Sequence, residues 1–457
     1  MAFSPLDSDI LAPLTTTAAM RAVFSEAARL AAMLRTEAAL ARAEAGLGLA
    51  PAGLAPAIEA IDPASLDLVA LGKGTGLAGV PVIPFVKAVQ ARLPKDLEAS
   101  FHKGATTQDI ADTGLVLQMR DAFSLLRTDG AAVLSGLSAL ADRHSDAPCA
   151  GRTYGQHGAP LTFGYKAAVW LAGIADVLDR LPEIETRVLT ASLAGPVGTL
   201  AGLRDKGPAV VEAFARELGL AAPPIAWHAR RAAMAEAGSW LAMLCGALGK
   251  MATDVANLAS TEVGEVAEPY VPGRGGSSAM PHKRNPVSAT VILSAAEASA
   301  PLASTMIASM VACHERPAGA WHAEWHALPT LFGLAAGALA EARRLAEGLE
   351  VDTARMRANL DITRGLLFAD AAAAVMARSA GRGAAHALVE EAAGEVRSSG
   401  RHLLDVLADR PDLPAGIDRA ALAAAFDLSP AVAAASQWID PVREAAARVA
   451  TRLLQTT

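Results

Sequence analysis

The sequence has 457 residues, of which 52% are hydrophobic but only 4% aromatic, so its core must be aliphatic and rich in alanine. A formal net charge of −7 argues against a nucleic-acid-binding protein that relies on a broad basic surface. The three cysteines are few, widely spaced and odd in number, which excludes a disulfide framework and a zinc motif and favours a reducing cytoplasm.

The apolar stretches of the chain predict a soluble, cytoplasmic protein. The first residues, MAFSPLDSDI, lack the basic start and the apolar run of a signal peptide. The most apolar long segment, residues 298–313, is too short and too rich in Ser and Thr to span a membrane.

The first half of the chain is expected to form long helices. One amphipathic helix is predicted over residues 19–47 and ends at a glycine, whereas prolines and glycines interrupt residues 51–94. Two further helical segments are predicted over residues 112–143 and 161–191.

The clearest periodicity lies in the second half. Apolar residues recur there in steps of three and four, at Leu241, Leu244, Leu248, Met251, Val255 and Leu258. This spacing predicts one buried stripe on a helix. A fourth helix is expected to begin at Pro286 and a fifth to cover residues 328–349. No stretch alternates as several exposed strands would, so we predict an all-α fold built on a long helical bundle.

The expected bundle divides the chain into three domains. We predict an N-terminal helical domain over residues 1–110, a central long-helix bundle over residues 111–345 and a C-terminal helical domain over residues 346–457. The borders are placed where the bundle begins and where it gives way to shorter helices.

A polar loop, residues 268–286, interrupts this helical pattern, and we call it the basic loop. It contains Arg274, Lys283 and Arg284, and no Asp or Glu occurs between residues 269 and 296. Its glycines allow close backbone approach to a ligand, and its cations predict an anion site. The alternative is a plain connector in which Asn285 caps the next helix and Pro286 is its first residue.

Two other polar clusters stand beside long helices. The first cluster, residues 101–109, reads FHKGATTQD, and the second cluster, residues 151–160, reads GRTYGQHGAP. Each combines a histidine, hydroxyl groups and a cation at the expected entrance of a helix, where backbone N–H groups favour anions. Either alone would be an ordinary capping loop, but three such clusters favour one composite site.

The three clusters in this order, with the letters GSSAMPHKRNP in the basic loop, resemble the fumarase/aspartase superfamily. The runs TEVGEVAEP at residues 261–269 and AGPVGTLAGL at residues 194–203 extend the resemblance over nearly the whole chain. It implies a central bundle of five long helices flanked by two smaller helical domains. It also implies a homotetramer in which each active site takes the three clusters from three different subunits.

The resemblance assigns roles by position. In the family's usual elimination a base removes a proton next to a carboxylate, and donors hold the resulting dianion. Ser277 matches the loop serine that acts as this base, and Lys283 and Asn285 match groups that bind the substrate carboxylate. The first-cluster contacts match His102, Thr106 and Thr107, and a second-cluster contact matches Thr153.

This chain departs from the fumarate-forming members in two coupled places. They carry His where this chain has Tyr154, and a Glu paired with that His where this chain has Thr290. Loss of both removes the ordinary device for activating an imidazole. The pattern resembles instead a cycloisomerase branch of the superfamily, which keeps a later histidine, here His157. The runs His314–Arg316 and Trp321–Trp325 support this branch.

In that branch a carboxylate of a conjugated tricarboxylate adds internally across a double bond, so no leaving group needs an acid. Lys283, Arg316 and Arg152 are candidates to neutralise the trianion. Asn285, Thr107 and loop N–H groups are candidates to hold the intermediate, and either Ser277 or His157 is expected to donate the proton. No metal cluster or phosphate-binding glycine pattern is apparent, so no cofactor is expected.

Two other functions remain as alternatives. One is a fumarate-releasing lyase that acts on a succinyl nucleotide or amino acid, against which the missing His–Glu pair counts. The other is a catalytically inactive helical tetramer, against which Ser277, Lys283 and Asn285 count, because a scaffold needs no anion-binding serine loop.

Overall fold

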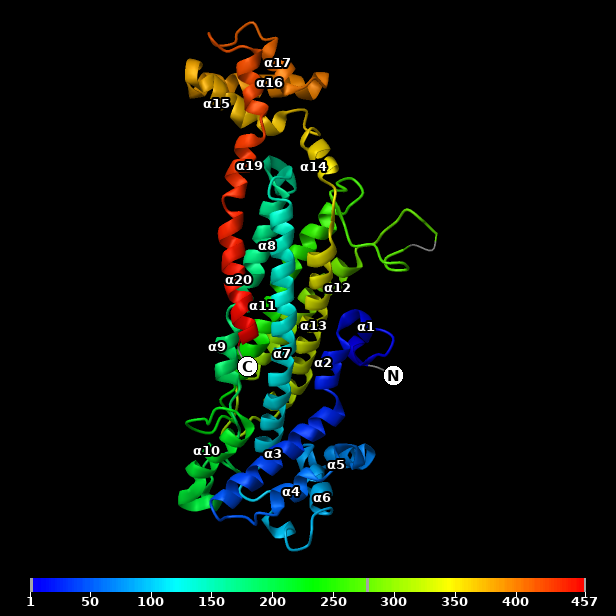
Figure 1. The fold of residues 1–457 in the computed structure, drawn as a ribbon, viewed down its shortest axis with the longest axis vertical. Helices are drawn as coiled ribbons and strands as arrows, with labels where there is room; N and C mark the ends of the chain where they lie inside the picture. Colours follow the sequence, from blue (N-terminus) through cyan, green and yellow to red (C-terminus); the bar gives the residue numbers. More distant parts are fainter. Residues whose placement is uncertain (1–2, 277–278, 456–457) are drawn as a thin grey trace.

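The computed structural model of the chain describes residues 3–276 and 279–455 and has a long helical bundle with a smaller group of helices at each end (Figure 1). Five helices of the bundle come from the middle of the sequence, and α20, from its end, packs against two of them, α7 and α8. These six are α7 Thr107–Arg143, α8 Phe163–Leu178, α11 Ala232–Leu258, α12 Val287–Ala308, α13 Ala320–Gly348 and α20 Ile439–Gln455. The predicted all-α fold and its long bundle are confirmed.

The helices at the lower end in Figure 1 come mostly from the start of the chain. They are α3 Glu26–Gly46, α4 Leu54–Glu59, α5 Leu68–Ala78, α6 Val82–Gln90 and, from later in the sequence, α10 Gly207–Leu218. The first two helices, α1 Ala12–Thr15 and α2 Ala18–Val23, lie beside the bundle, where both contact α13. A further helix, α9 Leu181–Val188, follows α8 beside the bundle. Contacts of α3 with α7 join this group to the bundle, and α3 also packs against α10.

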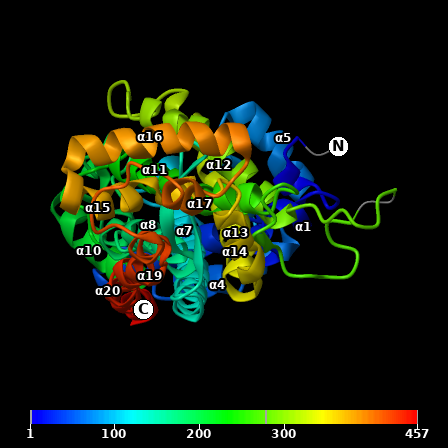
Figure 2. The same ribbon diagram turned by 90° about the horizontal axis from the view of Figure 1, so that it is seen from above.

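The helices at the upper end follow α13. They are α14 Thr353–Leu360, α15 Ala369–Ala380, α16 Arg382–Ser399, α17 Leu403–Ala408, α18 Arg419–Ala423 and α19 Ser429–Ser436. Viewed from above, α15, α16 and α17 lie across the end of the bundle (Figure 2). Single 3₁₀ turns occur at Pro5–Asp7, Pro63–Ser65, Glu98–Ser100, Ala201–Lys206, Leu366–Phe368 and Ala424–Phe426.

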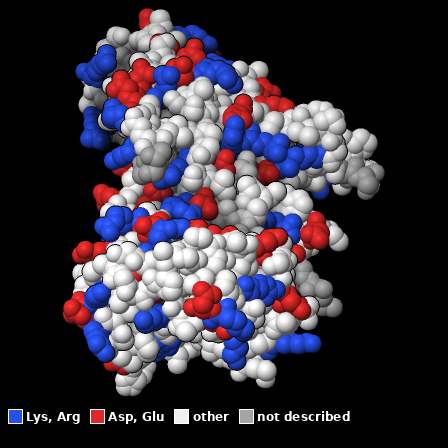
Figure 3. Space-filling view, turned by 60° about the horizontal axis from the view of Figure 1, so that its bottom comes forward, with Lys and Arg blue, Asp and Glu red and all other residues white. Residues whose placement is uncertain are grey.

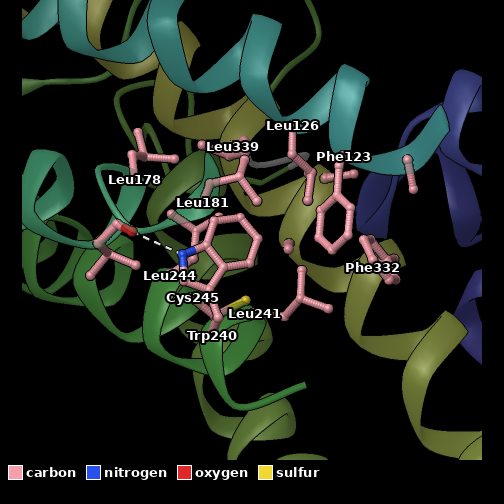
Figure 4. Close-up of a cluster of buried hydrophobic side chains, with 14 of the residues drawn as sticks. Phe123, Leu126, Leu178, Leu181, Trp240, Leu241, Leu244, Cys245, Phe332 and Leu339 are labelled. Atoms are coloured by element: carbon pink, nitrogen blue, oxygen red, sulfur yellow. Dashed lines mark hydrogen bonds between the residues drawn. The ribbon is translucent and has the colours of Figure 1, made fainter. Parts of the chain in front are cut away.

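Large apolar side chains from several helices fill the bundle core. Trp240 of α11 packs beside Phe123 of α7, which makes an edge-to-face contact with Phe332 of α13 at 5.1 Å between ring centroids (Figure 4). The Trp240 indole N–H donates to the carbonyl of Val177 at 2.8 Å, so this polar atom is satisfied within the core. All six residues of the predicted stripe are buried, which confirms that part of the helix prediction.

Two small antiparallel sheets connect the bundle to its surroundings. Strands β1 Pro148–Thr153 and β2 Gln156–Thr162 form a hairpin between α7 and α8. Strands β3 Val266–Ala267 and β4 Glu350–Val351 pair the segment before the basic loop with the segment after α13. The described parts of the basic loop, residues 268–276 and 279–286, project from the side of the bundle (Figures 1 and 2).

Two predicted helices are wrong in detail. The helix expected over residues 19–47 is two helices, because Ser25 leaves the helical conformation and its side chain accepts from the N–H of Ala28 as the N-cap of α3. The segment 161–191 begins inside β2 and breaks again at Asp179–Arg180, between α8 and α9. Local capping decides these borders, which an apolar pattern does not reveal.

Two bundle helices, α11 and α12, are long and apolar enough to cross a membrane by length and composition alone. They pack against each other and against α13. In α11 more than half of the apolar window is buried inside the chain, as expected of a core helix, whereas in α12 about a quarter is buried. Acidic and basic side chains are interspersed with larger uncharged areas on the face that Figure 3 shows.

Candidate active site

The first cluster lies at the beginning of α7. The Arg316 guanidinium donates to the Thr106 hydroxyl at 3.0 Å and to the Thr107 hydroxyl at 3.4 Å, although these residues are about 210 positions apart. It also donates to the carbonyl of Pro196 at 3.0 Å. Two hydroxyls and a guanidinium therefore meet at a helix N-terminus, which favours an anionic ligand. The fold thus brings together three residues that the sequence placed in one site.

The side chain of Asp109 holds the backbone of this cluster in place. Its buried carboxylate accepts from the backbone N–H of Thr106, Ala194 and Gly195, each at 2.9 Å. Asp109 and Thr106 form a capping box, so the same carboxylate starts α7 and holds the loop that carries Pro196. The imidazole of His228 also lies against this carboxylate, with its Nε2 2.6 Å from Oδ1 of Asp109.

A second buried ionic group supports the next turn of α7. Arg231 is fully buried and is paired with Asp112 at 2.7 Å and with Glu324. The indole N–H of Trp321 donates to Asp112 at 2.9 Å. The two carboxylates raise the pKa of Arg231 against the cost of burial, so its charge is retained. Trp321 thus has a packing and hydrogen-bonding role.

His102 is held from behind by α3. Its Nδ1 lies 2.6 Å from Oε1 of Glu37, a buried carboxylate. Burial opposes a charge on the imidazole, but the hydrogen bond and the charge of Glu37 outweigh it and raise the pKa of His102. Glu44, on the same helix, is also buried, and burial raises its pKa to about 7.

The second cluster is the β1–β2 hairpin. Arg152 forms a bidentate pair with the buried carboxylate of Glu265, at 3.0 and 2.5 Å, and Asn359 of α14 donates to the same carboxylate at 2.8 Å. The charge of Arg152 is therefore balanced within the subunit. Tyr154 is fully exposed at the hairpin tip and has a φ of 51°, followed by Gly155 at 76°. Such a tight turn needs two left-handed residues in succession.

His157 stands opposite Arg152 in the hairpin. Burial and the nearby charge of Arg152 lower the pKa of His157, so its imidazole is largely neutral at neutral pH. Its Nδ1 is buried and has no hydrogen-bond partner among the described residues. Thr153, the neighbour of Arg152, is exposed at the end of β1.

The basic loop is fixed at its two feet by ion pairs. Arg274 pairs with Glu341 at 2.5 Å, and Arg284 pairs with Glu350 at 3.0 Å on both nitrogens. Two of the three loop cations are therefore balanced by carboxylates of the same subunit, which the sequence did not reveal. For Lys283, by contrast, the described part of the chain offers no carboxylate within ion-pair distance. A cavity of about 420 Å³ lies beside Lys283 and Asn285.

Asn285 is not the cap of α12. Its backbone N–H donates to the carbonyl of Gly275 at 2.8 Å, and Pro286 occupies the N-cap position. The N–H groups of Ser288 and Ala289 are satisfied instead by the carboxylate of Glu268, each at 2.9 Å. The capping expected of Asn285 is therefore wrong, and its exposed side chain is left available. Ser277 lies outside the described residues.

The first and second clusters stand at opposite ends of α7 (Figure 1). This helix has 37 residues, so at 1.5 Å per residue the two clusters are about 55 Å apart. Arg152 links the second cluster to the segment that leads into the basic loop, through Glu265. A single subunit thus joins His102, Thr106, Thr107 and Arg316 in one place and Arg152, Thr153 and His157 in another.

The two positions that depart from the fumarate-forming pattern differ in their surroundings. Thr290 donates its hydroxyl to the carbonyl of Pro286 at 2.8 Å, and Tyr154 points into solvent.

The sequence did not reveal a role for Glu37, Asp109 or Glu265. Asp109 could have been found from its capping-box spacing to Thr106. The other two are acidic residues whose partners are distant in the sequence, so no local signal marks them.

Comparison with known proteins places the chain among lyases. A family model described as Lyase matches residues 14–298, and one described as Adenylosuccinate lyase C-terminus matches residues 365–442. A 3-carboxy-cis,cis-muconate cycloisomerase from Pseudomonas putida is 46% identical over 404 residues, which are 88% of this chain and 96% of that protein.

Two further comparisons extend this result. The crystal structure of 3-carboxy-cis,cis-muconate lactonizing enzyme from Pseudomonas putida matches with a TM-score of 0.93 at 42% identity, over 97% of this chain and 100% of that chain. A nitrosuccinate lyase from Streptomyces davaonensis is 42% identical over 447 residues, which are 95% of this chain and 94% of that protein. Relatives with different reactions are thus similar at comparable levels.

Proposed function

We infer the function of this chain from one premise: it belongs to the lyase family of the fumarase/aspartase superfamily, as the match over residues 14–298 and the identities above 40% show. We propose that it is an intramolecular lyase that converts 3-carboxy-cis,cis-muconate to 4-carboxymuconolactone, a step in the breakdown of protocatechuate. Curated relatives from three bacteria, at 42–46% identity, carry the name of this activity.

The reaction is an isomerisation. A carboxylate oxygen of the substrate forms a bond to a carbon of the conjugated diene, and a proton is added to the carbon next to another carboxylate. One C–O bond and one C–H bond form while one double bond is lost, and no fragment leaves. An acid for a leaving group is unnecessary, and neutralisation of three carboxylates becomes the main requirement.

One observation carries the proposal, namely the absence of the His–carboxylate pair at Tyr154 and Thr290. The Thr290 hydroxyl is engaged with the backbone of its own helix, and Tyr154 has no carboxylate partner among the described residues. A general acid activated by a carboxylate is what an elimination needs and an internal addition does not. The identities to the cycloisomerases agree with this chemistry.

We assign the substrate contacts accordingly. Lys283 and Arg316 supply positive charge, and Asn285 and Thr107 supply donors for the enediolate-like intermediate. His102, Thr106 and Thr153 complete the binding groups. Arg152 is already balanced by Glu265, so its main contribution is to fix the hairpin. Ser277 or His157 donates the proton, and the site needs no metal or other cofactor.

We propose that the working unit is a homotetramer in which three subunits contribute to each site. The separation of about 55 Å between the first and second clusters supports this, because no small tricarboxylate reaches both in one subunit. The exposed side of α12 also supports it. That side consists mainly of small and apolar residues, and Glu297 is the one charged residue of this helix. Contact with other subunits would cover it.

Two further features complete the proposal. We place the enzyme in the cytoplasm, without a nucleic-acid or membrane partner, since its net charge is −7 and its cysteines are unpaired. We also retain three domains, with borders near residues 110 and 345, close to the start of α7 and the end of α13.

A second candidate is a lyase that releases a small group from a substituted succinate. It is favoured by the 42% identity to the nitrosuccinate lyase, which extends over more residues than the identity to the Pseudomonas putida cycloisomerase. Here the proton would leave the substrate, rather than join it, and a leaving group would depart.

The deciding experiment measures both reactions on the purified protein. We expect 3-carboxy-cis,cis-muconate to lose its conjugated-diene absorbance and NMR to identify 4-carboxymuconolactone. Nitrosuccinate, adenylosuccinate and argininosuccinate are tested in parallel for release of an unsaturated dicarboxylate. Turnover of one of these with none of the muconate would replace the proposed function by the second candidate, and no turnover of any would favour an inactive scaffold.

A further inference from the structure

Two buried carboxylates lie behind His102. Glu37 and Glu44 are seven residues apart on α3, so they lie on the same face of the helix, and both side chains are almost completely buried. Glu37 contacts His102 Nδ1 at 2.6 Å. Oε1 of Glu44 is buried and has no hydrogen-bond partner in the described part of the chain. Neither carboxylate is among the groups assigned to the proposed reaction.

The charges around the imidazole favour its protonated form. Glu37 and Glu44 face it from α3, and Asp109 faces it from α7. Lys103, its neighbour in sequence, faces Glu44 and provides the opposing positive charge. A buried carboxylate is costly without a compensating charge, and among the described residues Glu37 is paired with no Lys or Arg. The partner that meets this need is a His102 imidazolium.

The position of His102 is also fixed by the backbone. Its φ of 57° lies in the left-handed region, which costs free energy for a residue other than glycine and is kept only where the surroundings impose it. With Nδ1 committed to Glu37, the other ring nitrogen, Nε2, has no hydrogen-bond partner among the described residues. An imidazolium in this position carries a proton on Nε2 that it can donate to a ligand.

We propose that Glu37 is a positioning residue, which holds His102 as an imidazolium whose Nε2–H donates to a substrate carboxylate. Because this role needs an anionic substrate at the first cluster, it rests on the proposed function. Whether His102 attracts or repels the carboxylate depends on the protonation state of its imidazole. A neutral His102 that keeps its proton on Nδ1 would present the lone pair of Nε2 to the carboxylate and repel it. Charged His102 attracts it.

The substitution Glu37→Gln tests this role, because glutamine has the same shape and still accepts from Nδ1–H but brings no charge. We measure kinetics with 3-carboxy-cis,cis-muconate from about pH 5.5 to 8.5, a range around the ordinary His pKa of about 6.5. We expect E37Q to lower kcat/KM by roughly 10- to 100-fold at the alkaline end, mainly through KM, and the loss to shrink at the acid end.

The matched control is Glu44→Gln, seven residues further along the same buried face of α3. Glu44 makes no hydrogen bond to His102 and is the weakest of the charges that raise its pKa, so E44Q should change the pH profile far less than E37Q. A uniform loss for E37Q at every pH, or none, would show that Glu37 is merely structural and overturn the proposal. Equal profiles for E37Q and E44Q would overturn it as well.

Binding of tricarballylate, an unreactive tricarboxylate, separates this inference from the function itself. Calorimetry on the same variants should show the same pH-dependent weakening in E37Q whether or not the muconate is turned over. If the wild type binds tricarballylate but converts no muconate, the proposed function fails while the role of Glu37 stands or falls on the binding curves. Should E37Q not fold, H102Q replaces it and must lose the wild-type pH dependence of binding; unchanged binding would refute the proposal.

Discussion

In the proposed function the first cluster and the basic loop both bind an anionic substrate, but the fold prepares them in opposite ways. In the first cluster His102 and Asp109 have buried partners, Glu37 and His228, and the carboxylate of Asp109 fixes three backbone N–H groups at 2.9 Å. In the basic loop Arg274 and Arg284 form ion pairs, and the neighbours of Arg284, Lys283 and Asn285, are exposed. The first cluster is thus largely ordered within one subunit, whereas partners for the loop would come from the substrate and the other subunits of the proposed tetramer.

This difference predicts where substitutions act. Changes in the first cluster should affect stability and binding together, because its groups are buried in a shared network. Changes in the basic loop should affect turnover and leave the fold intact, because its exposed residues contribute little to folding.

The largest effect is expected from the proton donor. Ser277→Ala or His157→Ala should lower kcat by about 10²–10⁴-fold, the usual cost of losing a general acid. Because the pKa of His157 is lowered, donation by its imidazolium would make kcat rise as the pH falls towards that pKa. Donation by Ser277 would leave no such rise. If both variants stay within a few-fold of the wild type, the assignment of the proton donor is wrong.

Asp109→Asn should give the next largest effect. The amide places an NH₂ group where the carboxylate accepts three backbone N–H groups, so we expect the free energy of unfolding to fall by roughly 3–5 kcal/mol. Urea denaturation of the variant and the wild type at matched protein concentration measures this free energy. Asp146→Asn, at an exposed position after α7, is the control and should change stability by less than about 0.5 kcal/mol. Equal effects of the two would contradict the organising role of Asp109.

The pH dependence of stability gives a related test of the first cluster. Burial raises the pKa of Glu44 to about 7, above its ordinary value, so the unfolded chain loses this proton first as the pH rises. The contribution of Glu44 to the free energy of unfolding is therefore fully present below the pKa that Glu44 has in the unfolded chain. It is lost as the pH rises through about 7. Glu44→Gln should raise stability by up to about 3 kcal/mol at alkaline pH and change it little at acid pH. The opposite sign would mean that Glu44 is ionised and paired.

Lys283→Gln and Arg284→Gln sharpen the contrast within the basic loop, since they remove the same charge from adjacent positions. The Lys283→Gln variant should lose roughly 10- to 100-fold in kcat/KM, as expected when a charged group that contacts the substrate is removed. Arg284 is engaged with Glu350 at 3.0 Å in an exposed pair, which is worth about 0–1 kcal/mol. Its loss should therefore cost only a few-fold. A larger loss for Arg284 would show that the foot of the loop, not its exposed cation, limits the reaction.

The smallest effect concerns metal removal. Dialysis against a chelator should leave turnover unchanged, because the proposed substrate contacts are cations, hydroxyls and an amide. The described residues contain no group of three or more His, Cys, Asp or Glu side chains arranged to hold a metal ion. Activity that is lost on dialysis and restored by an added metal would contradict the proposal.

The sequence by itself determined the helical class, the buried stripe of α11 and the three clusters with their residue types. These features depend on short-range patterns, such as apolar steps of three and four or polar residues next to a helix. The departure at Tyr154 and Thr290, on which the proposed reaction depends, was likewise visible in the letters alone.

Only the tertiary structure decided which of the predicted cations remain available. Arg152, Arg274 and Arg284 are balanced by Glu265, Glu341 and Glu350, and the partners lie 66 to 113 residues apart in the chain. The same is true of His102 and Glu37, which are 65 residues apart. Charge neutralisation acts over a few ångströms in space and has no fixed spacing in sequence, so composition overestimates the positive charge of the site until the packing of the helices is known.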